Sequence, residues 1–556
     1  MTAAVAAGLP SPTARPRHFA GTGTLLRLAL RRDRVMIPAW VLALGLAVAS
    51  MGSAFEGLYD TAAKRGELAA SMNGNGSMRA LYGPVFSDSI GGLIAWRMAG
   101  FGAVLAAVMS LLIVVRHTRE EEETGRQELL SAAMVGRRAP LTSALLSALL
   151  ANAVLAVLIA AGLTGSGRPA AGSLALGLAI GCTGLLFAGL AAIAAQLTES
   201  ARMAKGLTGA VLGLAFALRA AGDAAGAGGS SRTESGATSS SLTWISPIGW
   251  SENLRPYAAE RWWVLLLFVV ATALAVAASY ALTARRDIGM SFLPARPGPA
   301  EAPRTLAGPF GLAWRLQRTT LLGWSAGFLC AGGVFGGIAK GASDLVGSNQ
   351  QTREIFERMG GQQGLTDAFL ATMAGMLGMV ASIYAVGAVL RLRGEETGER
   401  AEPVLAGAVG RLRWAAGHLV VAYGGTAVVL GFGGLALGLS YGASVHDVGG
   451  RLGPVLAATL SQVPAVWTLT GLAVLVFGLF PKATTAVWAL VGGCLAIGWI
   501  GPSLKFPQWA MDLSPYTHLP KLPGAEATAA PFVWLLALSA VLAVAGLLGV
   551  RRRDLG

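Results

Sequence analysis

Charged residues are scarce in this chain. They make up 13% of its 556 residues, and 54% are hydrophobic, whereas soluble domains carry about 25% charged residues. The mean hydropathy is +0.59. The apolar residues gather in runs of about 20, the length that crosses the hydrocarbon core of a bilayer as a helix. These features exclude a soluble globular protein and predict an all-α polytopic membrane protein, in which the 76 glycines would let helices approach one another closely.

Sequence motifs of enzymes are also missing. The chain has no GxxxxGK[ST] loop to hold the phosphates of ATP, and no HExxH or GxSxG motif. Its three cysteines, Cys182, Cys330 and Cys494, lie in apolar runs, where cysteine behaves as a small hydrophobic residue. The five histidines are scattered. We therefore expect no enzymatic chemistry, bound metal or cofactor in this chain.

Twelve apolar runs are long enough to be membrane spans, and this even number places both termini on one side. Six belong to the first half of the chain and six to the second. Their approximate ranges are 35–56, 92–116, 140–163, 172–197, 203–221 and 262–284, then 320–339, 366–390, 414–439, 453–478, 482–500 and 531–550.

The arginines determine which side of the membrane the termini occupy. Clusters flank the spans on one predicted face, for example Arg31 and Arg32 before span one, Arg137 and Arg138 after span two, and Arg551 after span twelve. Because loops rich in Lys and Arg stay in the cytoplasm, we predict a multi-pass protein of the plasma membrane with both termini cytoplasmic. The net charge of +14 then reflects topology, and no nucleic-acid partner is expected.

An acidic segment occurs twice. Glu122-Glu123-Thr124-Gly125 follows span two, and Glu395-Glu396-Thr397-Gly398 follows span eight, 273 positions later (122 to 395). Glu128 and Glu402 follow within the same segments, 274 positions apart (128 to 402). A matched pair of tryptophans, Trp40 and Trp324, is 284 apart (40 to 324). The spacing predicts two parallel repeats of six spans.

The predicted repeats are residues 1–286 and 311–556, joined by a Pro-rich cytoplasmic linker at 287–310. A basic, amphipathic stretch precedes the first span of each repeat, and such stretches form helices that lie in the membrane interface. We place these interfacial helices at residues 22–34 and 311–319.

The acidic segments, 117–139 and 392–413, begin acidic and end basic, which stabilises a short helix through its dipole. A solvated surface helix would explain one copy, but two matched copies favour docking of a basic partner surface. Major-facilitator transporters also carry a Gly/Arg motif after spans two and eight. Their required Gly and Asp are replaced here by Leu129 and Ala133, so that motif is absent.

Two other functions remain open from the residues alone. An ion- or proton-driven antiporter would need ionisable residues within its spans, and the sequence offers only Arg97 and Arg219 near span ends, with no convincing buried carboxylate. A membrane transferase would need a carboxylate site, and Asp60, Glu67 and Asp88 are available in one outer loop but are joined by no motif.

The doubled acidic segments, the basic stretches before spans one and seven, and the Ser246-Pro247 and Ser514-Pro515 steps before the last span of each half form a set. Together they resemble the fused permeases of ATP-binding-cassette type-two exporters, in particular the actinobacterial polyketide-antibiotic and tetronasin-type multidrug exporters. The resemblance covers essentially the whole chain.

This resemblance implies an exporter of small hydrophobic compounds such as antibiotics, powered by a separate cytoplasmic ATPase. Two ATPase copies would carry ATP and Mg and, on closing together, push the coupling segments and rock the two halves. The residues implied in ATPase coupling are Glu122, Glu123, Thr124, Gly125, Glu128, Glu395, Glu396, Thr397, Gly398 and Glu402. Gly125 and Gly398 would form the turns, and the exchange of Arg126 for Glu399 predicts that the two docking sites differ.

The resemblance also implies a substrate path lined by the first, second and fifth spans of each half. Methionine and aromatic side chains there would suit varied, bulky apolar compounds. The residues placed on this path are Trp40, Met98, Phe101, Met109, Phe216, Trp324, Met373, Met376 and Met379.

Overall fold

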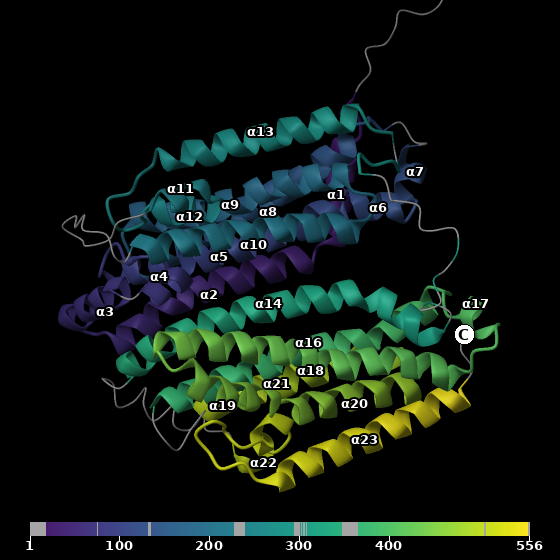
Figure 1. The fold of residues 1–556 in the computed structure, drawn as a ribbon. Coiled ribbons are helices and arrows are strands. Elements are labelled where there is room, and N and C mark those ends of the chain that lie inside the picture. Colours follow the sequence, from purple (N-terminus) through teal and green to yellow (C-terminus); the bar gives the residue numbers. More distant parts are fainter. Residues whose placement is uncertain are drawn as a thin grey trace, which may run out of the picture. The chain divides into compact units, whose positions relative to one another are not determined.

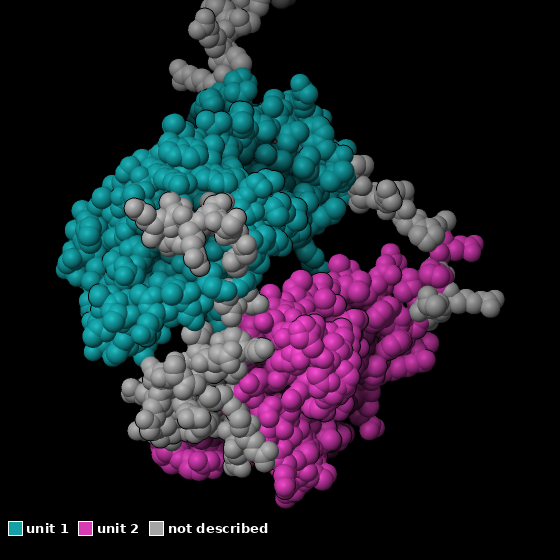
Figure 2. Space-filling model, turned by 60° about the vertical axis from the view of Figure 1, so that its left-hand side comes forward, with its two compact units in different colours: residues 1–297 teal, residues 298–556 magenta. Residues whose placement is uncertain are grey.

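The computed structural model of the chain consists of two compact units, Met1–Pro297 and Gly298–Gly556, which Figure 2 shows in different colours. Half of the linker predicted at 287–310 lies outside the described residues. Residues 18–74, 76–131, 135–226, 240–287, 289–293, 308–346, 365–504 and 507–553, with 301, 303 and 306, are described.

Unit 1 is built of helices only, within the residues described for it. Its long helices are α2, α5, α8, α9, α10 and α13, and the others are short (Figure 1). The bounds are α1 Thr22–Arg32, α2 Met36–Leu58, α3 Ala62–Gly74, α4 Gly76–Tyr82, α5 Ile90–Arg116, α6 Arg119–Glu123, α7 Arg126–Ser131, α8 Ala139–Gly165, α9 Ala170–Leu197, α10 Ala201–Ala225, α11 Ser241–Ile245, α12 Pro247–Asn253 and α13 Val264–Ala284.

Unit 2 repeats this order with some helices joined or divided. The bounds are α14 Pro309–Val346, α16 Leu365–Thr397, α17 Glu402–Leu405, α18 Arg411–Ser444, α19 Val448–Leu460, α20 Val463–Leu479, α21 Ala486–Leu504, α22 Gln508–Met511 and α23 Ala529–Arg552, with short 3-10 turns at Pro481–Ala483 and Pro515–His518.

Eleven helices in the described part of the chain are long and apolar enough to cross a bilayer. They fall on eleven of the twelve predicted spans. In place of the eleventh, α21 offers a shorter apolar stretch, Ala486–Gly498. The prediction of an all-α polytopic membrane protein is confirmed.

The first long helix of each unit begins differently. In unit 1 the chain turns at residues 33–35, so α1 is separate from α2, and its basic face matches the helix predicted at 22–34. In unit 2 the predicted interfacial stretch 311–319 is continuous with the span and forms the first turns of α14. No break-forming sequence interrupts it, so the helix runs on for 38 residues.

The tenth span is divided just before Pro464. Helix α19 ends at Leu460 and α20 begins at Val463, with Pro464 in its first turn. Proline fixes its own φ and disfavours the α-conformation in the residue before it, so it starts a helix well and continues one poorly.

The same helix pairs pack inside both units. In unit 1, α2 packs on α8, α5 on α9 and α9 on α13; in unit 2, α14 packs on α18, α16 on α20 and α20 on α23. Within each unit, the short helices gather at the ends of the long ones. Helices α1, α6 and α7 lie at one end of unit 1, and α3, α4, α11 and α12 lie at the other (Figure 1).

Glycines allow the closest of these contacts. A Cβ at Gly478 of α20 would meet the backbone of Gly546 in α23, and a Cβ at Gly546 would meet the backbone of Val474. In a membrane, helix association depends on such close van der Waals packing because lipid tails remove most of the hydrophobic driving force. The α20–α23 pair therefore depends on these two glycines.

We predict that Gly478→Ala lowers the stability of the purified chain, because its methyl group would force the α20 and α23 backbones apart. Overpacking of this kind costs about 1–3 kcal/mol. The matched control is Gly431→Ala in α18, where a Cβ would meet nothing within 4 Å and where Ala should gain up to about 1 kcal/mol from helix propensity. Thermal unfolding in detergent measures both. Equal melting temperatures for the two variants would contradict the predicted contact.

Candidate functional site at the arginine-rich ends of the two units

The first acidic segment forms two short helices directly after α5. Helix α6 holds four consecutive glutamates, Glu120 to Glu123, and α7 follows after a turn at Gly125. Gly125 has φ +69°, a left-handed conformation that glycine adopts without steric cost. The turn gives α6 and α7 separate directions at what we call the arginine-rich end of unit 1, the end that carries Arg32, Arg119 and Arg286.

Each of the four glutamates has a different partner. The Lys205 ammonium lies 3.7 Å from Glu120, and Arg32 of α1 donates to Glu121. Glu123 accepts a hydrogen bond of 3.1 Å from the backbone N–H of Ala201, the first residue of α10. A carboxylate at a helix N-terminus is stabilised by the unpaired N–H groups and the helix dipole. Helix α6 is thereby bound to both α1 and α10.

Glu122 is the most deeply placed of the four. Its side chain is 6% exposed and forms ion pairs with Arg119 and with Arg286, which follows α13. Both arginines also donate to the carbonyl oxygen of Met290. Since removing one partner of a buried ion pair leaves an uncompensated charge, such a loss costs about 3–5 kcal/mol. The end of α13 is therefore attached to α6 by buried charge.

A second charged group attaches α1 to the end of α5. Asp33, immediately after α1, is fully buried and lies 2.7 Å from Arg116 and 2.6 Å from His117. In unit 2, Gln317 of α14 lies 3.0 Å from His418 of α18. This polar contact joins the first long helix to the third, whereas Asp33 of unit 1 contacts the end of the second.

The acidic segment of unit 2 repeats the central ion pairs of unit 1. Glu396 pairs with Arg393, three residues before it, and with Arg553, which follows the last helix. Glu122 makes the same two contacts with Arg119 and Arg286. The structural counterpart of Glu122 is therefore Glu396.

This correspondence fixes the register at 274 positions (122 to 396) instead of the 273 given by the identical letters. Arg126 near Glu121 corresponds to Arg400 near Glu395. Arg137 donates to the carbonyl oxygen of Arg286 at 2.6 Å, and Arg411 donates to that of Arg553 at 2.6 Å.

The register corrects one predicted turn. The second segment turns at Glu399, with φ +56°, and not at Gly398. Glu399 is the counterpart of Gly125 (125 to 399). In the 274 register, Glu120 corresponds to Gly394 and Gly125 to Glu399. The Glu-Glu-Thr-Gly motif of unit 2 therefore begins one position earlier than that of unit 1. A non-glycine residue in this conformation costs roughly 1 kcal/mol or more.

The contacts of the two segments differ beyond this shared centre. In the described part of unit 2, the partners of Glu395 and Glu396 are arginines within the segment and Arg553. The counterparts of Glu120 and Glu123 are Gly394 and Thr397, and Thr397 donates to its own helix. Unit 1 thus has attachments from the acidic segment to α10 that these positions of unit 2 lack.

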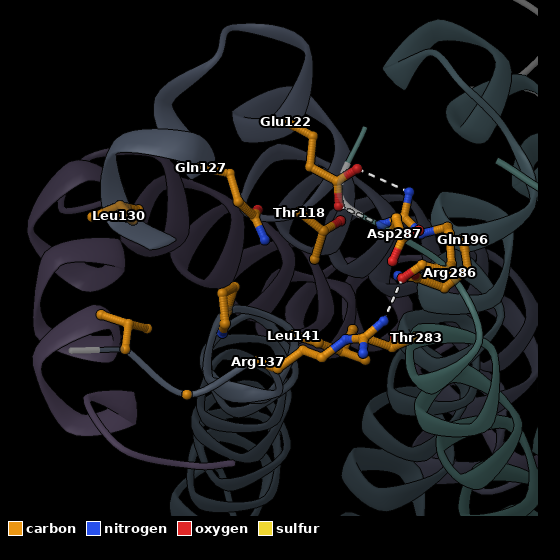
Figure 3. A pocket seen from close by; sticks show the side chains of 13 residues that line it. Thr118, Glu122, Gln127, Leu130, Arg137, Leu141, Gln196, Thr283, Arg286 and Asp287 are labelled. Atoms are coloured by element: carbon orange, nitrogen blue, oxygen red, sulfur yellow. Dashed lines mark hydrogen bonds and ion pairs between the residues drawn. The ribbon is translucent and has the colours of Figure 1, made fainter. Parts of the chain in front are cut away.

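Figure 3 shows a pocket of about 380 Å³ beside Glu122. Glu122 points toward Arg286 on one side, and Gln127 lines the pocket nearby. The side-chain oxygen of Gln196 is buried and has no hydrogen-bond partner. The pocket therefore offers a hydrogen-bond acceptor beside an apolar wall that includes Leu130 and Leu141.

Exposure divides the predicted coupling residues into two groups. Glu122, Glu395 and Glu396 have side chains at most 8% exposed and are paired within their own units. The exposed group lies on the outer surface of the segments and consists of Glu123, Thr124, Glu128, Thr397, Gly398 and Glu402.

Comparison with known proteins gives the family. The family model described as "Multidrug efflux system permease Rv1217c, C-terminal domain" matches residues 23–282 and 306–551, one stretch in each unit. The chain is also 45% identical over 541 residues to the multidrug efflux system permease protein Rv1217c of Mycobacterium tuberculosis, covering 97% of this chain and 96% of that protein. The chain belongs to the multidrug efflux system permease family.

The residues predicted to line a substrate path in this permease occupy two environments. Trp40, Met98, Phe101 and Phe216 of unit 1 are partly exposed, and the rings of Phe101 and Phe216 lie 6.4 Å apart. Met109 is fully buried in the core among α2, α5, α8 and α9. It packs between helices and faces no open path within unit 1.

The path residues of unit 2 are all partly exposed. Trp324 of α14 lies 6.1 Å from the ring of Tyr384 on α16. The three methionines Met373, Met376 and Met379 follow one another at three-residue intervals along α16.

The sequence reasoning missed two buried carboxylates in this permease. Asp223 is fully buried at the end of α10, and Glu252 is 7% exposed on α12, both at the end of unit 1 opposite α6. Arg219, which the sequence did single out, lies between them. Glu252 lies in the short, proline-started helix α12, outside any predicted span, so nothing in the sequence indicates that it is buried.

We predict that Arg286→Gln destabilises the permease by about 3–5 kcal/mol, because Glu122 would then remain buried with one partner fewer. The neighbouring Arg285 is exposed, so Arg285→Gln should change stability by less than about 0.5 kcal/mol. Arg553→Gln and Arg552→Gln form the matched pair in unit 2. Thermal unfolding of the four variants in detergent measures the effect. If Arg286→Gln and Arg285→Gln unfold at the same temperature, the ion pairs do not stabilise the end of unit 1.

Proposed function

We propose that this chain is the permease subunit of an ATP-driven exporter of small hydrophobic compounds, such as antibiotics and other drugs. The transport part is supported by family membership and by its likeness to a protein named a multidrug efflux permease. In this proposal, a separate ATPase of the ATP-binding-cassette type supplies the energy, two copies act on each permease, and ATP and Mg are held by those copies. The chain itself carries out no enzymatic reaction.

The observation that carries the proposal is the set of attachments made by α6. This five-residue helix holds α1, the start of α10 and the end of α13 through Glu121, Glu123 and Glu122 respectively. A short helix at the membrane surface needs none of these attachments merely to join α5 to α8. A force applied to α6 would therefore reach several spans.

The two groups of acidic residues then have different roles. The exposed residues on α7 and α17, including Glu128 and Glu402, would meet basic residues of the ATPase, where charge sets orientation and the rate of encounter. The buried residues Glu122 and Glu396 would transmit motion, because an ion pair inside the protein holds helices together more firmly than one in water.

The proposal also places the chain in the plasma membrane with its arginine-rich ends and both termini in the cytoplasm. The rule that Lys and Arg accumulate in cytoplasmic loops supports this orientation. The ATPase would therefore approach from the side on which ATP is found. The lipid bilayer and a hydrophobic substrate complete the list of partners.

The two segments would transmit unequally. A push on α6 would reach α1, α10 and α13, whereas a push on the segment of unit 2 would reach α23 through Arg553. The predicted exchange of Arg126 for Glu399 does not hold in the 274 register, where Arg126 corresponds to Arg400. The difference rests instead on Glu120 and Glu123, which Gly394 and Thr397 replace. Unit 1 would carry more of the coupling.

We predict that reversing the exposed charges, Glu128→Lys with Glu402→Lys, weakens binding of the ATPase by about tenfold or more, since like charges would face each other across the interface. Affinity purification of the permease from its native membrane, with quantification of any protein that contains a phosphate loop, measures this. The control is Glu67→Lys, an exposed glutamate on α3 at the opposite end of unit 1. If no such protein accompanies the wild-type permease, the ATP-driven proposal is wrong.

A proton-driven drug antiporter is the second candidate. The buried carboxylates Asp223 and Glu252 favour it, because ionisable residues buried in membrane proteins mark ion pathways in many transporters. Against it, both carboxylates lie at one end of unit 1. Among the described residues, no further buried carboxylate continues from them along the long helices toward α6.

Transport into inverted membrane vesicles separates the two candidates. The ATP-driven exporter should accumulate a fluorescent hydrophobic drug when ATP is supplied and the pH gradient is collapsed by an ionophore. The antiporter should accumulate it with an imposed pH gradient and no ATP. Vesicles from cells that lack the chain provide the background. Accumulation that follows the gradient and ignores ATP would replace the first candidate by the second.

A further inference from the structure

Four charged side chains meet inside the end of unit 1 opposite α6. Arg79 comes from α4, Arg219 and Asp223 from α10, and Glu252 from α12, and all four are buried. The Arg219 guanidinium donates to Glu252 at 3.1 Å and lies 3.4 Å from Asp223. It also donates to the carbonyl oxygens of residues 80 and 81 in α4. Arg219 therefore joins three separate helices.

Asp223 and Glu252 are neighbours in this cluster, because both contact the guanidinium of Arg219, at 3.4 Å and 3.1 Å. Asp223 also accepts from the hydroxyl of Thr243, at 3.3 Å, and its backbone carbonyl accepts from Arg79 at 3.0 Å. Two neighbouring carboxylates do not both ionise readily, since like charges repel at short range.

One oxygen of Glu252 faces a small cavity. Its Oε2 is buried and has no hydrogen-bond partner. A cavity of about 20 Å³ lies beside Glu252 and is lined by residues that include Tyr82, Trp96 and Pro256. This volume is sufficient for one water molecule. A proton could therefore reach Glu252 through a single bound water.

Two glycines leave room for this carboxyl group. A Cβ at Gly83 or at Gly100 would lie 2.9 Å from an oxygen of Glu252. Gly83 also has φ +84°, a conformation that side chains rarely adopt. The surrounding backbone is thus shaped around the carboxyl group.

The geometry points to Glu252 as a proton-binding site at this end of unit 1, beside Asp223. When Glu252 is protonated, its buried carboxyl group carries no charge, and Arg219 remains bound to Asp223 and to α4. When Glu252 is ionised, its ion pair with Arg219 offsets only part of the cost of burying the charge, and movement of α12 toward water relieves the rest. The ligand is a proton, and its loss loosens α12.

Other charged groups around the cluster are positive. Arg97 of α5 lies over the ring of Tyr82 at 3.9 Å, and Arg255 after α12 lies over Phe86 at 4.5 Å. The two arginines within the cluster, Arg219 and Arg79, favour the ionised form of Glu252. Burial acts in the opposite direction and raises the pKa of Glu252 well above its usual range, with the charge of Asp223 adding to the rise.

The direction of the pH effect follows from this raised pKa. Below the usual pKa of a glutamate, the carboxyl is protonated in both the folded and the unfolded chain. As the pH rises toward the higher pKa of the folded state, the unfolded chain ionises first, and the stabilising contribution of the proton is lost. The wild-type protein should therefore lose stability relative to a neutral substitute as the pH rises through that range.

Unit 2 has no counterpart of this site at the equivalent positions. Ser246 donates to the carbonyl of Ala215 at 2.6 Å, and Ser514 donates to that of Cys494 at 3.1 Å. Counting on from these pairs, Gly498 replaces Arg219 (four after 494 and 215) and Pro520 replaces Glu252 (six after 514 and 246). Among the described residues, the site therefore occurs in unit 1 and not at these positions of unit 2.

The experiment is infrared spectroscopy of the full chain in lipid nanodiscs between about pH 5 and pH 9. The wild type should show a protonated-carboxyl band at neutral pH that disappears as the pH rises. Glu252→Gln should remove that band, and Glu56→Gln, which alters a glutamate paired with Arg168 on the surface of the same unit, should leave it unchanged. A wild-type spectrum with no such band at any pH would overturn the proposal.

Hydrogen exchange of α12 tests the mechanical consequence. After correction for the intrinsic effect of pH, exchange in residues 247–253 of the wild type should be about tenfold slower when Glu252 is protonated than when it is ionised. Glu252→Gln should exchange at the slower rate at every pH. If the variant does not fold, the pH titration of wild-type exchange still decides the matter, and a rate independent of pH contradicts the proposal. Neither measurement needs ATP or a partner, so failure here is distinct from failure of the ATP-driven proposal.

Discussion

The buried ion pairs of Glu122 with Arg119 and Arg286 are the interaction on which the arginine-rich end of unit 1 depends. They place a negative charge inside a membrane protein and compensate it twice, and each arginine also directs one N–H group to the carbonyl oxygen of Met290. Such a group stabilises the fold only while it is complete, because each member is costly to bury alone. The position of α6, and of every helix attached to it, follows from this requirement.

Unit 2 has the same ion pairs, but its described residues lack much of what surrounds them in unit 1. Glu396, Arg393 and Arg553 preserve the two ion pairs, whereas the attachments that Glu120 and Glu123 make in unit 1 have no equivalent. At the opposite end, the charged cluster around Arg219 occurs in unit 1 and not at the equivalent positions of unit 2. The duplication has therefore kept the packing of the long helices and one ion-pair centre, and the two copies have diverged in the groups that connect helix ends.

Much of the fold follows from the sequence, because runs of about 20 apolar residues have few alternatives to a membrane helix. The spans and the repeat were predictable for this reason. The register was ambiguous, because Glu-Glu-Thr-Gly matches at 273 positions and Glu128 and Glu402 at 274; the partners of Glu122 and Glu396 show that 274 is correct.

Burial was the other property that the sequence did not reveal. Met109 is as apolar as its neighbours on a lipid-facing or path-facing surface, and its place in the core depends on how α5 meets other helices. Glu252 is polar and lies in a short connecting helix, yet tertiary packing encloses it. The exposed and buried glutamates of α6 are the same residue type at consecutive positions, so the sequence does not distinguish them. Their distances to Arg32, Lys205 and Arg286 do.

The separation of Glu122 from Arg286 has a consequence for biosynthesis. The two residues are 164 positions apart, and Glu396 and Arg553 are 157 apart. In each unit, the partner of the acidic segment is thus made only after the last helix has left the ribosome. Domains are completed in order during synthesis, so unit 1 has both members of its pair before most of unit 2 exists. Each ion pair thereby closes a finished six-helix unit, and a chain truncated before Arg286 would leave Glu122 with Arg119 as its remaining ion-pair partner.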